Sequence, residues 1–95
     1  MHRVYAIWLH ARCIPTTHAA TKAVYVGDTA KPRHVRCTEH LTGHLAAGIV
    51  HRHGLRLARS LYRGSPSYLT RAGAQRGAKT LAQALRKQGY YVVEG

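Results

Sequence analysis

The segment from residue 71 to residue 88 constrains the fold most, because it contains the clearest periodic pattern in the chain. It is rich in Ala, Leu, Gln, Arg and Lys, all of which favour helices. Its apolar residues recur at the spacing of about 3.6 residues that gives a helix one buried face: Ala74, Ala78, Leu81, Ala82 and Leu85. Gly89 follows at a position where glycine commonly ends a helix. We therefore expect a long helix near the C-terminus.

Four other segments are typical of strands. Residues 3–9 and 23–27 are rich in β-branched and aromatic side chains. Residues 55–62 alternate partway between apolar and polar, which predicts an edge strand with Arg56 pointing outward. Residues 90–93 form a last short apolar run. These segments predict a small sheet.

Two shorter helices are expected between the second and third strands. Asp28 and Thr29 predict a turn, and Pro32 suits the first turn of a helix over about 32–42 that Gly43 ends. A second helix is expected over about 44–53, ended by Gly54, with these apolar residues on one face: Leu45, Ala46, Ile49 and Val50.

The resulting order is β-β-α-α-β-α-β, with connecting loops at 11–22 and 64–67. A chain of 95 residues suffices for one domain. We expect a single domain over residues 1–95 of the α/β (α+β) class, with a small, mostly antiparallel central sheet flanked by helices.

The charge balance indicates the kind of partner. Fifteen Lys and Arg stand against three acidic residues, for a formal net charge of +12. Such an excess attracts polyanions by counterion release, although it could also serve solubility or meet anionic lipid. We find no run of ~18 apolar residues and no signal-peptide pattern. We therefore expect a cytoplasmic protein whose partner is DNA or RNA and not a membrane, and the sequence predicts no oligomeric state.

Several motifs together are similar to one nuclease superfamily. Val4-Tyr5 stands on the first expected strand, with Arg3 where that superfamily has glycine, and Tyr25-Val26-Gly27 stands on the second. Arg36 and His40 follow in an R-x-x-x-H arrangement. The chain resembles the GIY-YIG superfamily over nearly its whole length, except for the loop at 11–22, which is longer than usual.

The resemblance implies a GIY-YIG-like fold and a phosphodiester-cleaving site. Tyr5 and Tyr25 would line the pocket, one of them helping to activate the nucleophile. Arg36 would hold the scissile phosphate through its guanidinium. His40, four residues further along the helix, would project from the same face. As an alternative, the tyrosines are core aromatics and Arg36 and His40 belong to an ordinary solvated helix.

One element of the superfamily pattern is missing. The resemblance implies a glutamate on the last long helix that holds a divalent metal, yet the matching position lies near Ala78, and no acid occurs between residues 40 and 93. Mg²⁺ or Mn²⁺ would be the cofactor of an active enzyme, with Asp28 as a replacement ligand. Glu39 is expected to point elsewhere, being about 100° around the helix from His40. A natural loss and an engineered Glu-to-Ala change at Ala78 both fit the sequence.

Histidine and cysteine spacing leaves a zinc site open as an alternative. Cys37, His40 and His44 have the spacing of half a site, and Cys13 would have to arrive from a distant loop. Structural zinc requires four ligands. The sequence therefore predicts no resident metal site.

Basic residues outside the motifs are candidates for phosphate contacts or, alternatively, solvated surface charges. Those expected to bind nucleic acid are Lys31, Arg33, Arg52, Arg71, Arg76, Lys79 and Arg86. Tyr62 and Tyr68 flank the loop at 64–67, where they could stack on unpaired bases or pack internally.

The sequence therefore predicts a nucleic-acid-binding, degenerate or inactivated nuclease. Two alternatives stay open: an active metal-dependent endonuclease, and a ribosome-associated RNA-binding structural protein.

Overall fold

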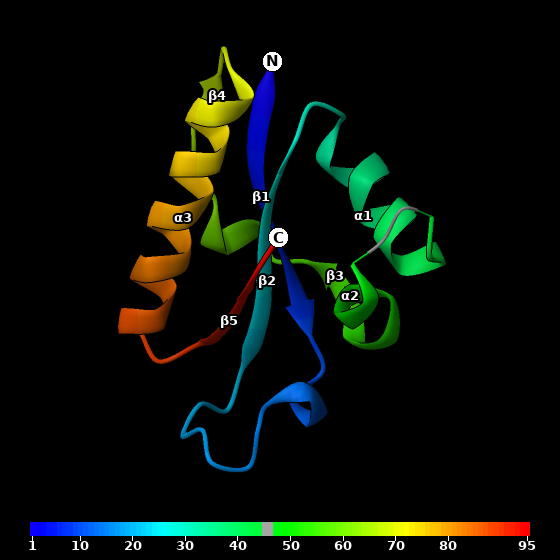
Figure 1. Cartoon of the computed structure of the whole chain (residues 1–95), viewed down its shortest axis with the longest axis vertical. Helices are drawn as coiled ribbons and strands as arrows, with labels where there is room; N and C mark the ends of the chain where they lie inside the picture. The colour runs from blue at the N-terminus through cyan, green and yellow to red at the C-terminus, as the bar shows by residue number, and fades with distance from the viewer. Residues whose placement is uncertain (45–46) are drawn as a thin grey trace.

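The computed structural model describes residues 1–44 and 47–95. In this part of the chain, a five-stranded mixed sheet lies between two helical layers (Figure 1). Strand β1 (His2–Leu9) is central and pairs antiparallel with β2 (Ala23–Thr29), β3 (Gly54–Leu57) and the short β4 (Ser67–Tyr68). Strand β5 (Tyr91–Glu94) pairs parallel with β2. The expected α+β class with a mostly antiparallel sheet is confirmed.

The helices divide between the two faces of the sheet. Helix α3 (Arg71–Lys87) covers one face, whereas α1 (Arg33–Thr42) and α2 (Gly48–His53) cover the other (Figure 1). Successive side chains of β1 alternate between the two layers, because a strand has a period of two residues. Val4 and Ala6 join the core under α3, and Tyr5 and Ile7 join the core under α1 and α2. Both faces are buried, which explains the nearly continuous apolar run of β1.

Helix α3 matches its predicted extent and buried face. Its residues at the sheet are Ala74, Ala78, Ala82 and Leu85, which are buried, and Leu81, which is half-buried. The Thr70 hydroxyl oxygen accepts the backbone N–H of Gly73 at 3.0 Å and caps the N-terminus. Gly89, with a φ of 94°, follows the helix in the left-handed conformation that glycine tolerates. No helix of the described residues is both long and apolar enough to cross a membrane.

Two glycines inside α3 are explained by Tyr68 on β4. A side chain at Gly77 would collide with the Tyr68 hydroxyl, and one at Gly73 would touch its ring. Tyr68 is therefore half-buried against the helix, and Tyr62 is buried as well. Both tyrosines pack internally, so neither stands exposed for base stacking.

The second strand is longer than expected. Asp28 and Thr29 do not form a turn, because β1 extends far enough to pair Val4 with Asp28 and Arg3 with Thr29. The predicted turn at these two residues is therefore wrong, and the chain leaves the strand after Thr29.

Residues 54–62 also differ from expectation. The strand ends at Leu57, and a 3-10 turn, η2, follows at Arg59–Leu61. The backbone turns at Ala58, which is buried and donates its N–H to the Ala6 carbonyl. The edge position of β3 and the exposure of Arg56 match the prediction.

The connections hold three further differences. Helix α2 begins at Gly48, later than expected, and the predicted positions Leu45 and Ala46 lie outside the described residues. The expected loop at 11–22 contains a 3-10 turn, η1 (Ala11–Cys13). Strand β4 escaped prediction because it pairs only two residues with β1.

Candidate functional site

Three aromatic rings meet on the sheet face that carries α1. The Tyr5 and Tyr25 ring centroids are 6.3 Å apart, and the His40 ring lies 5.9 Å from Tyr5 and 5.3 Å from Tyr25. Tyr5 and Tyr25 come from adjacent strands, and His40 comes from the last turn of α1. The structure therefore brings together three residues that the sequence separates by up to 35 positions.

Both ring nitrogens of His40 are engaged within the fold. The backbone N–H of Ala47 donates to Nδ1 at 3.2 Å, so Nδ1 carries a lone pair. In the neutral ring the proton then resides on Nε2, which donates to the Tyr5 hydroxyl oxygen at 2.7 Å. His40 therefore ties the segment before α2 to the centre of the sheet.

Burial controls the ionisation of this cluster. Tyr5 is 2% exposed and His40 is 1% exposed. Burial raises the pKa of Tyr5, and the neighbouring Tyr25 raises it further, whereas the positive charge of Arg36 lowers it. Burial also lowers the pKa of His40 to about 4, with the Arg36 charge acting in the same direction. At neutral pH the cluster holds a neutral phenol and a neutral imidazole.

Gly27 makes room for the Tyr5 ring. It lies directly opposite Tyr5 in the β1–β2 register. A Cβ atom at Gly27 would lie 2.8 Å from the Tyr5 hydroxyl oxygen and 3.0 Å from Cζ. The glycine of the Tyr-Val-Gly motif is therefore needed for close packing of the aromatic cluster.

Arg36 is the more exposed member of the cluster, with 21% of its side chain open to solvent. Its charge lowers the pKa of Tyr5, Tyr25 and His40, which places it beside all three. Its guanidinium also pairs with Glu39 at 3.0 Å.

Glu39 does not point away from the cluster, contrary to expectation. It accepts from Lys31 at 2.6 Å and from Arg36 at 3.0 Å. These two hydrogen bonds, first Lys31 and then Arg36, hold the pKa of Glu39 below its usual range. The prediction failed because a helical i,i+3 pair brings the Arg36 and Glu39 side chains together.

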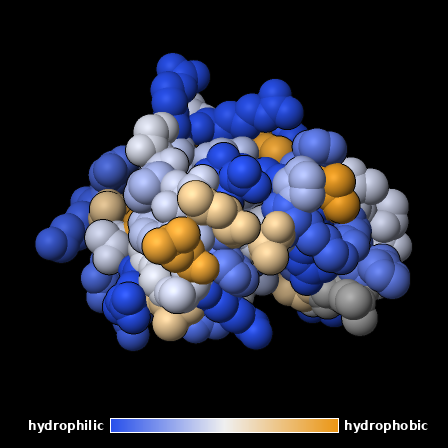
Figure 2. All heavy atoms as spheres, turned by 90° about the horizontal axis from the view of Figure 1, so that it is seen from above, coloured by the Kyte–Doolittle hydropathy of each residue, from blue (hydrophilic) through white to orange (hydrophobic). Residues whose placement is uncertain are grey.

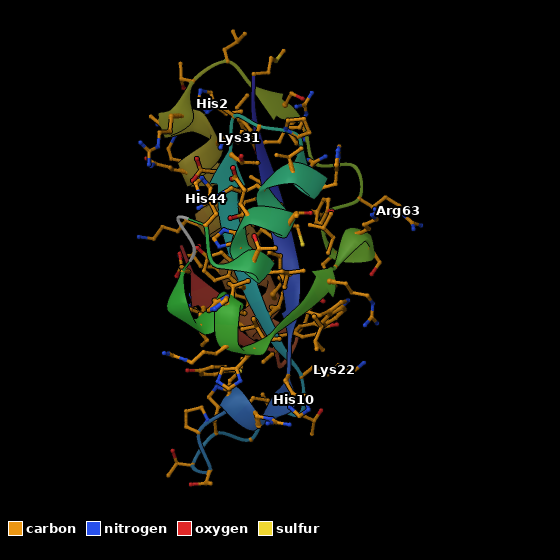
Figure 3. All side chains as sticks on the ribbon, turned by 90° about the vertical axis from the view of Figure 1, so that its right-hand side faces the viewer. His2, His10, Lys22, Lys31, His44 and Arg63 are labelled. Atoms are coloured by element: carbon orange, nitrogen blue, oxygen red, sulfur yellow. The ribbon has the colours of Figure 1, made fainter. Side chains whose placement is uncertain are left out.

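A cleft opens beside Arg36 at the end of the sheet. It has a volume of about 350 Å³ and is lined by His2, Asp28, Thr29, Ala30, Arg36 and Arg71. Figure 3 shows His2 and Lys31 at this same end of the molecule. Arg71 is the first residue of α3, so the cleft joins the helices from both sides of the sheet. We name it the Arg36 cleft.

The residues present do not fit a divalent metal. Ala78 packs with Val4 and Val26 in the core under α3, so a side chain there lies across the sheet from Tyr5. Asp28 lines the Arg36 cleft, but in the company of two arginines. Within residues 1–44 and 47–95, no three His, Cys, Asp or Glu side chains are grouped to hold a metal ion. This finding applies equally to magnesium and to the alternative zinc site.

The residues expected to contact phosphate do not share one surface. Arg71 lies in the Arg36 cleft, and Lys31 is paired with Glu39 near its rim. Arg33 lies at the start of α1, and Arg52 is exposed on α2. The remaining three lie exposed on α3: Arg76, Lys79 and Arg86, the last paired with Glu94 at 2.8 Å.

Two basic residues that the sequence did not single out, Arg59 and Arg63, line one groove with Arg33. Arg59 is the first residue of η2 and Arg63 follows the turn, and both are exposed. Arg59 lies in the segment expected to be a strand over residues 55–62 and Arg63 lies just beyond it, so no sequence pattern grouped the two.

Comparison with protein-family models, with curated proteins and with solved structures finds no match.

Proposed function

We propose that this chain is a nucleic-acid-binding domain of the GIY-YIG type that holds backbone phosphates of DNA or RNA and does not cleave them. The observation that carries the proposal is the Arg36 cleft. Arg36 and Arg71 both line this cleft, and Arg36 lies beside the buried cluster of Tyr5, Tyr25 and His40. Arginine suits phosphate because its planar donors match two phosphate oxygens.

The surface charge supports a polyanionic partner. The ion pairs among the described residues engage Lys31, Arg36 and Arg86. With a net charge of +12, most cations have no acid to balance them. Figure 2 shows the end of the molecule that lies at the top of Figure 1, near the N-terminus. This surface is mostly hydrophilic, and its apolar atoms form small groups. Counterion release from phosphates supplies affinity to such a surface.

The same geometry argues against catalysis. Hydrolysis requires a group that activates water, and His40 has its acceptor nitrogen occupied by the Ala47 N–H. Burial disfavours the Tyr5 phenolate. The cleft holds one carboxylate, from Asp28, where a hard cation prefers several oxygen ligands. The proposed role of the Tyr5, Tyr25 and His40 cluster is to position Arg36. The proposed location of the protein is the cytoplasm.

A binding titration tests the proposal. The affinity for labelled duplexes of DNA and of RNA is measured by fluorescence anisotropy across a salt series, with wild type, Arg36→Ala and Arg12→Ala. Arg12 is a matched control because it is exposed in η1, at the far end of the molecule (Figure 1). We expect Arg36→Ala to reduce the salt slope by about one, and Arg12→Ala to leave it unchanged. Absence of binding at low salt would refute the proposal.

A cleavage assay tests the catalytic part separately. Supercoiled plasmid incubated with the wild-type protein and Mg²⁺ or Mn²⁺ is expected to stay intact. Nicking that disappears in Asp28→Asn would instead establish an active endonuclease, since Asp28 is the carboxylate that shares the cleft with Arg36.

A further inference from the structure

A second basic groove lies on the other flank of α1. It is larger than the Arg36 cleft, at about 610 Å³. Its walls come from β1, α1, β3 and the turn η2, and its lining residues are Arg3, Pro32, Arg33, His34, Leu57, Arg59, Tyr62 and Arg63. Arg63 extends outward on this side of α1 (Figure 3). We name it the arginine groove.

No acidic side chain lines the arginine groove. The chain contains three acids, all within the described residues: Asp28 lies in the Arg36 cleft, Glu39 pairs with Lys31 and Arg36, and Glu94 pairs with Arg86. Four guanidiniums therefore share the groove without a protein counter-charge. Mobile ions from solvent must balance them, and a bound polyanion would release those ions with a gain in entropy.

Arg33 is held in place before any ligand arrives. Its Nε–H donates to the Val4 carbonyl at 2.7 Å, and its guanidinium carbon lies 4.7 Å from the Tyr62 ring centroid. The bond to Val4 uses one of five N–H donors, so four remain on the two Nη atoms. A side chain fixed in this way loses less conformational entropy on binding than a mobile one.

Tyr62 brings a second arginine to the same place. Arg59 lines the groove together with Tyr62 and Arg33. Burial raises the pKa of Tyr62, whereas the charges of Arg33 and Arg59 lower it, so both arginines act on this side chain. Tyr62 therefore acts as the floor that spaces two cations. Helix α1 also begins here without an acid in its first turn, so its positive end adds to the field.

We propose that the arginine groove binds the sugar-phosphate backbone of the nucleic acid, through Arg59 and Arg63 at its rim and Arg33 above the ring of Tyr62. The inference rests on the proposed function and names the face that contacts the strand. It assigns the main contact to the α1 side of the sheet and not to the outer face of α3.

The test compares two variants with equal charge. Arg59→Ala/Arg63→Ala removes two exposed cations from the groove, and Arg76→Ala/Lys79→Ala removes two exposed cations from α3. Because the net charge falls by the same amount, long-range attraction is matched between them. All four positions are exposed, and thermal unfolding by circular dichroism verifies that both variants fold.

Affinity for the DNA and RNA duplexes is measured at several salt concentrations. Two lost phosphate contacts reduce the salt slope by about two, which corresponds to a loss of about 60-fold in affinity at ~0.1 M salt. We expect this loss in Arg59→Ala/Arg63→Ala and a several-fold smaller one in Arg76→Ala/Lys79→Ala. In parallel, amide shifts of ¹⁵N-labelled wild-type protein on titration with a short duplex are expected to move at His34, Arg59 and Arg63.

Each other outcome overturns the inference in an identifiable way. Equal losses in the two variants would mean that net charge alone matters, and a greater loss in the α3 variant would locate the contact on that helix. In both cases nucleic-acid binding would survive. Absence of duplex binding by the wild type would remove the proposed function as well. Groove-dependent binding of phosphatidylserine vesicles, without duplex binding, would identify a lipid surface as the partner.

Discussion

Acidification should destabilise this protein through His40, because its folded state buries the neutral imidazole. The pKa of His40 falls from an ordinary 6.5 to about 4 on folding, chiefly by burial. Between these values the unfolded chain binds more protons than the folded one, so stability is complete above pH 6.5 and declines as the pH falls toward 4. Among the charged neighbours, Arg36 disfavours the imidazolium and Glu39 favours it, and the effect of burial outweighs that of Glu39.

The magnitude follows from linkage. At pH 5 the shift corresponds to a loss of ~2 kcal/mol relative to neutral pH, and near pH 4 to ~3 kcal/mol. A domain of this size has a total stability of about 5–15 kcal/mol, so the effect is measurable.

The assay is urea unfolding at pH 7.5, 6 and 5 at constant ionic strength, for wild type and His40→Gln. Glutamine does not titrate but retains an N–H that can reach Tyr5. The other seven histidines are present in both proteins, so the difference between the two curves isolates His40. We expect the free energy of unfolding of the wild type to fall by ~2 kcal/mol more than that of the variant. Parallel curves would show that His40 is protonated as easily in the folded protein as in the unfolded one, and would refute the reasoning.

Three substitutions test the packing around the cluster and the cap of α3. Tyr5→Phe should cost about 1–3 kcal/mol in urea unfolding, because the buried Nε2–H of His40 loses its acceptor; an unchanged midpoint would contradict the bond. Gly27→Ala should cost about 1–3 kcal/mol by overpacking against Tyr5, and less in a Tyr5→Phe background; strict additivity would argue against the clash. Thr70→Ala should lower stability by about 1 kcal/mol through loss of the helix cap, with Thr70→Ser as the control that retains it.

Helices and strands were predicted correctly where a periodic or continuous run of apolar residues extends over most of the element. The five-residue stripe of α3 and the apolar run of β1 needed no knowledge of their partners. The end of β2 could not be predicted, because Asp28 is a poor strand former that is held in the sheet by pairing with β1. The turn at Arg59–Leu61 was not predicted either, because the sequence pattern of a strand continues past Leu57 although the backbone turns away at Ala58.

In the candidate site, too, sequence patterns predicted some features, whereas others depend on the folded structure. The motif spacing singled out Tyr5, Tyr25, Arg36 and His40, and the fold brings them together, although their functional roles stay predictions. The ion pair of Glu39 and the engagement of both His40 nitrogens depend on side-chain geometry that no spacing rule contains. The arginine groove depends on three segments, distant in sequence, that meet only after the sheet has formed.

The position of β5 has a consequence for how the molecule assembles. Strands β1 and β2 can pair as a local antiparallel hairpin, but β5 adds to β2 in parallel orientation, across more than sixty residues of intervening chain. That pairing requires α3 to cross the sheet first, because α3 leads directly into β5. The slow, non-local step of folding should therefore be the arrival of the α3–β5 unit, which leaves the β2 margin open to intermolecular pairing until the step is complete.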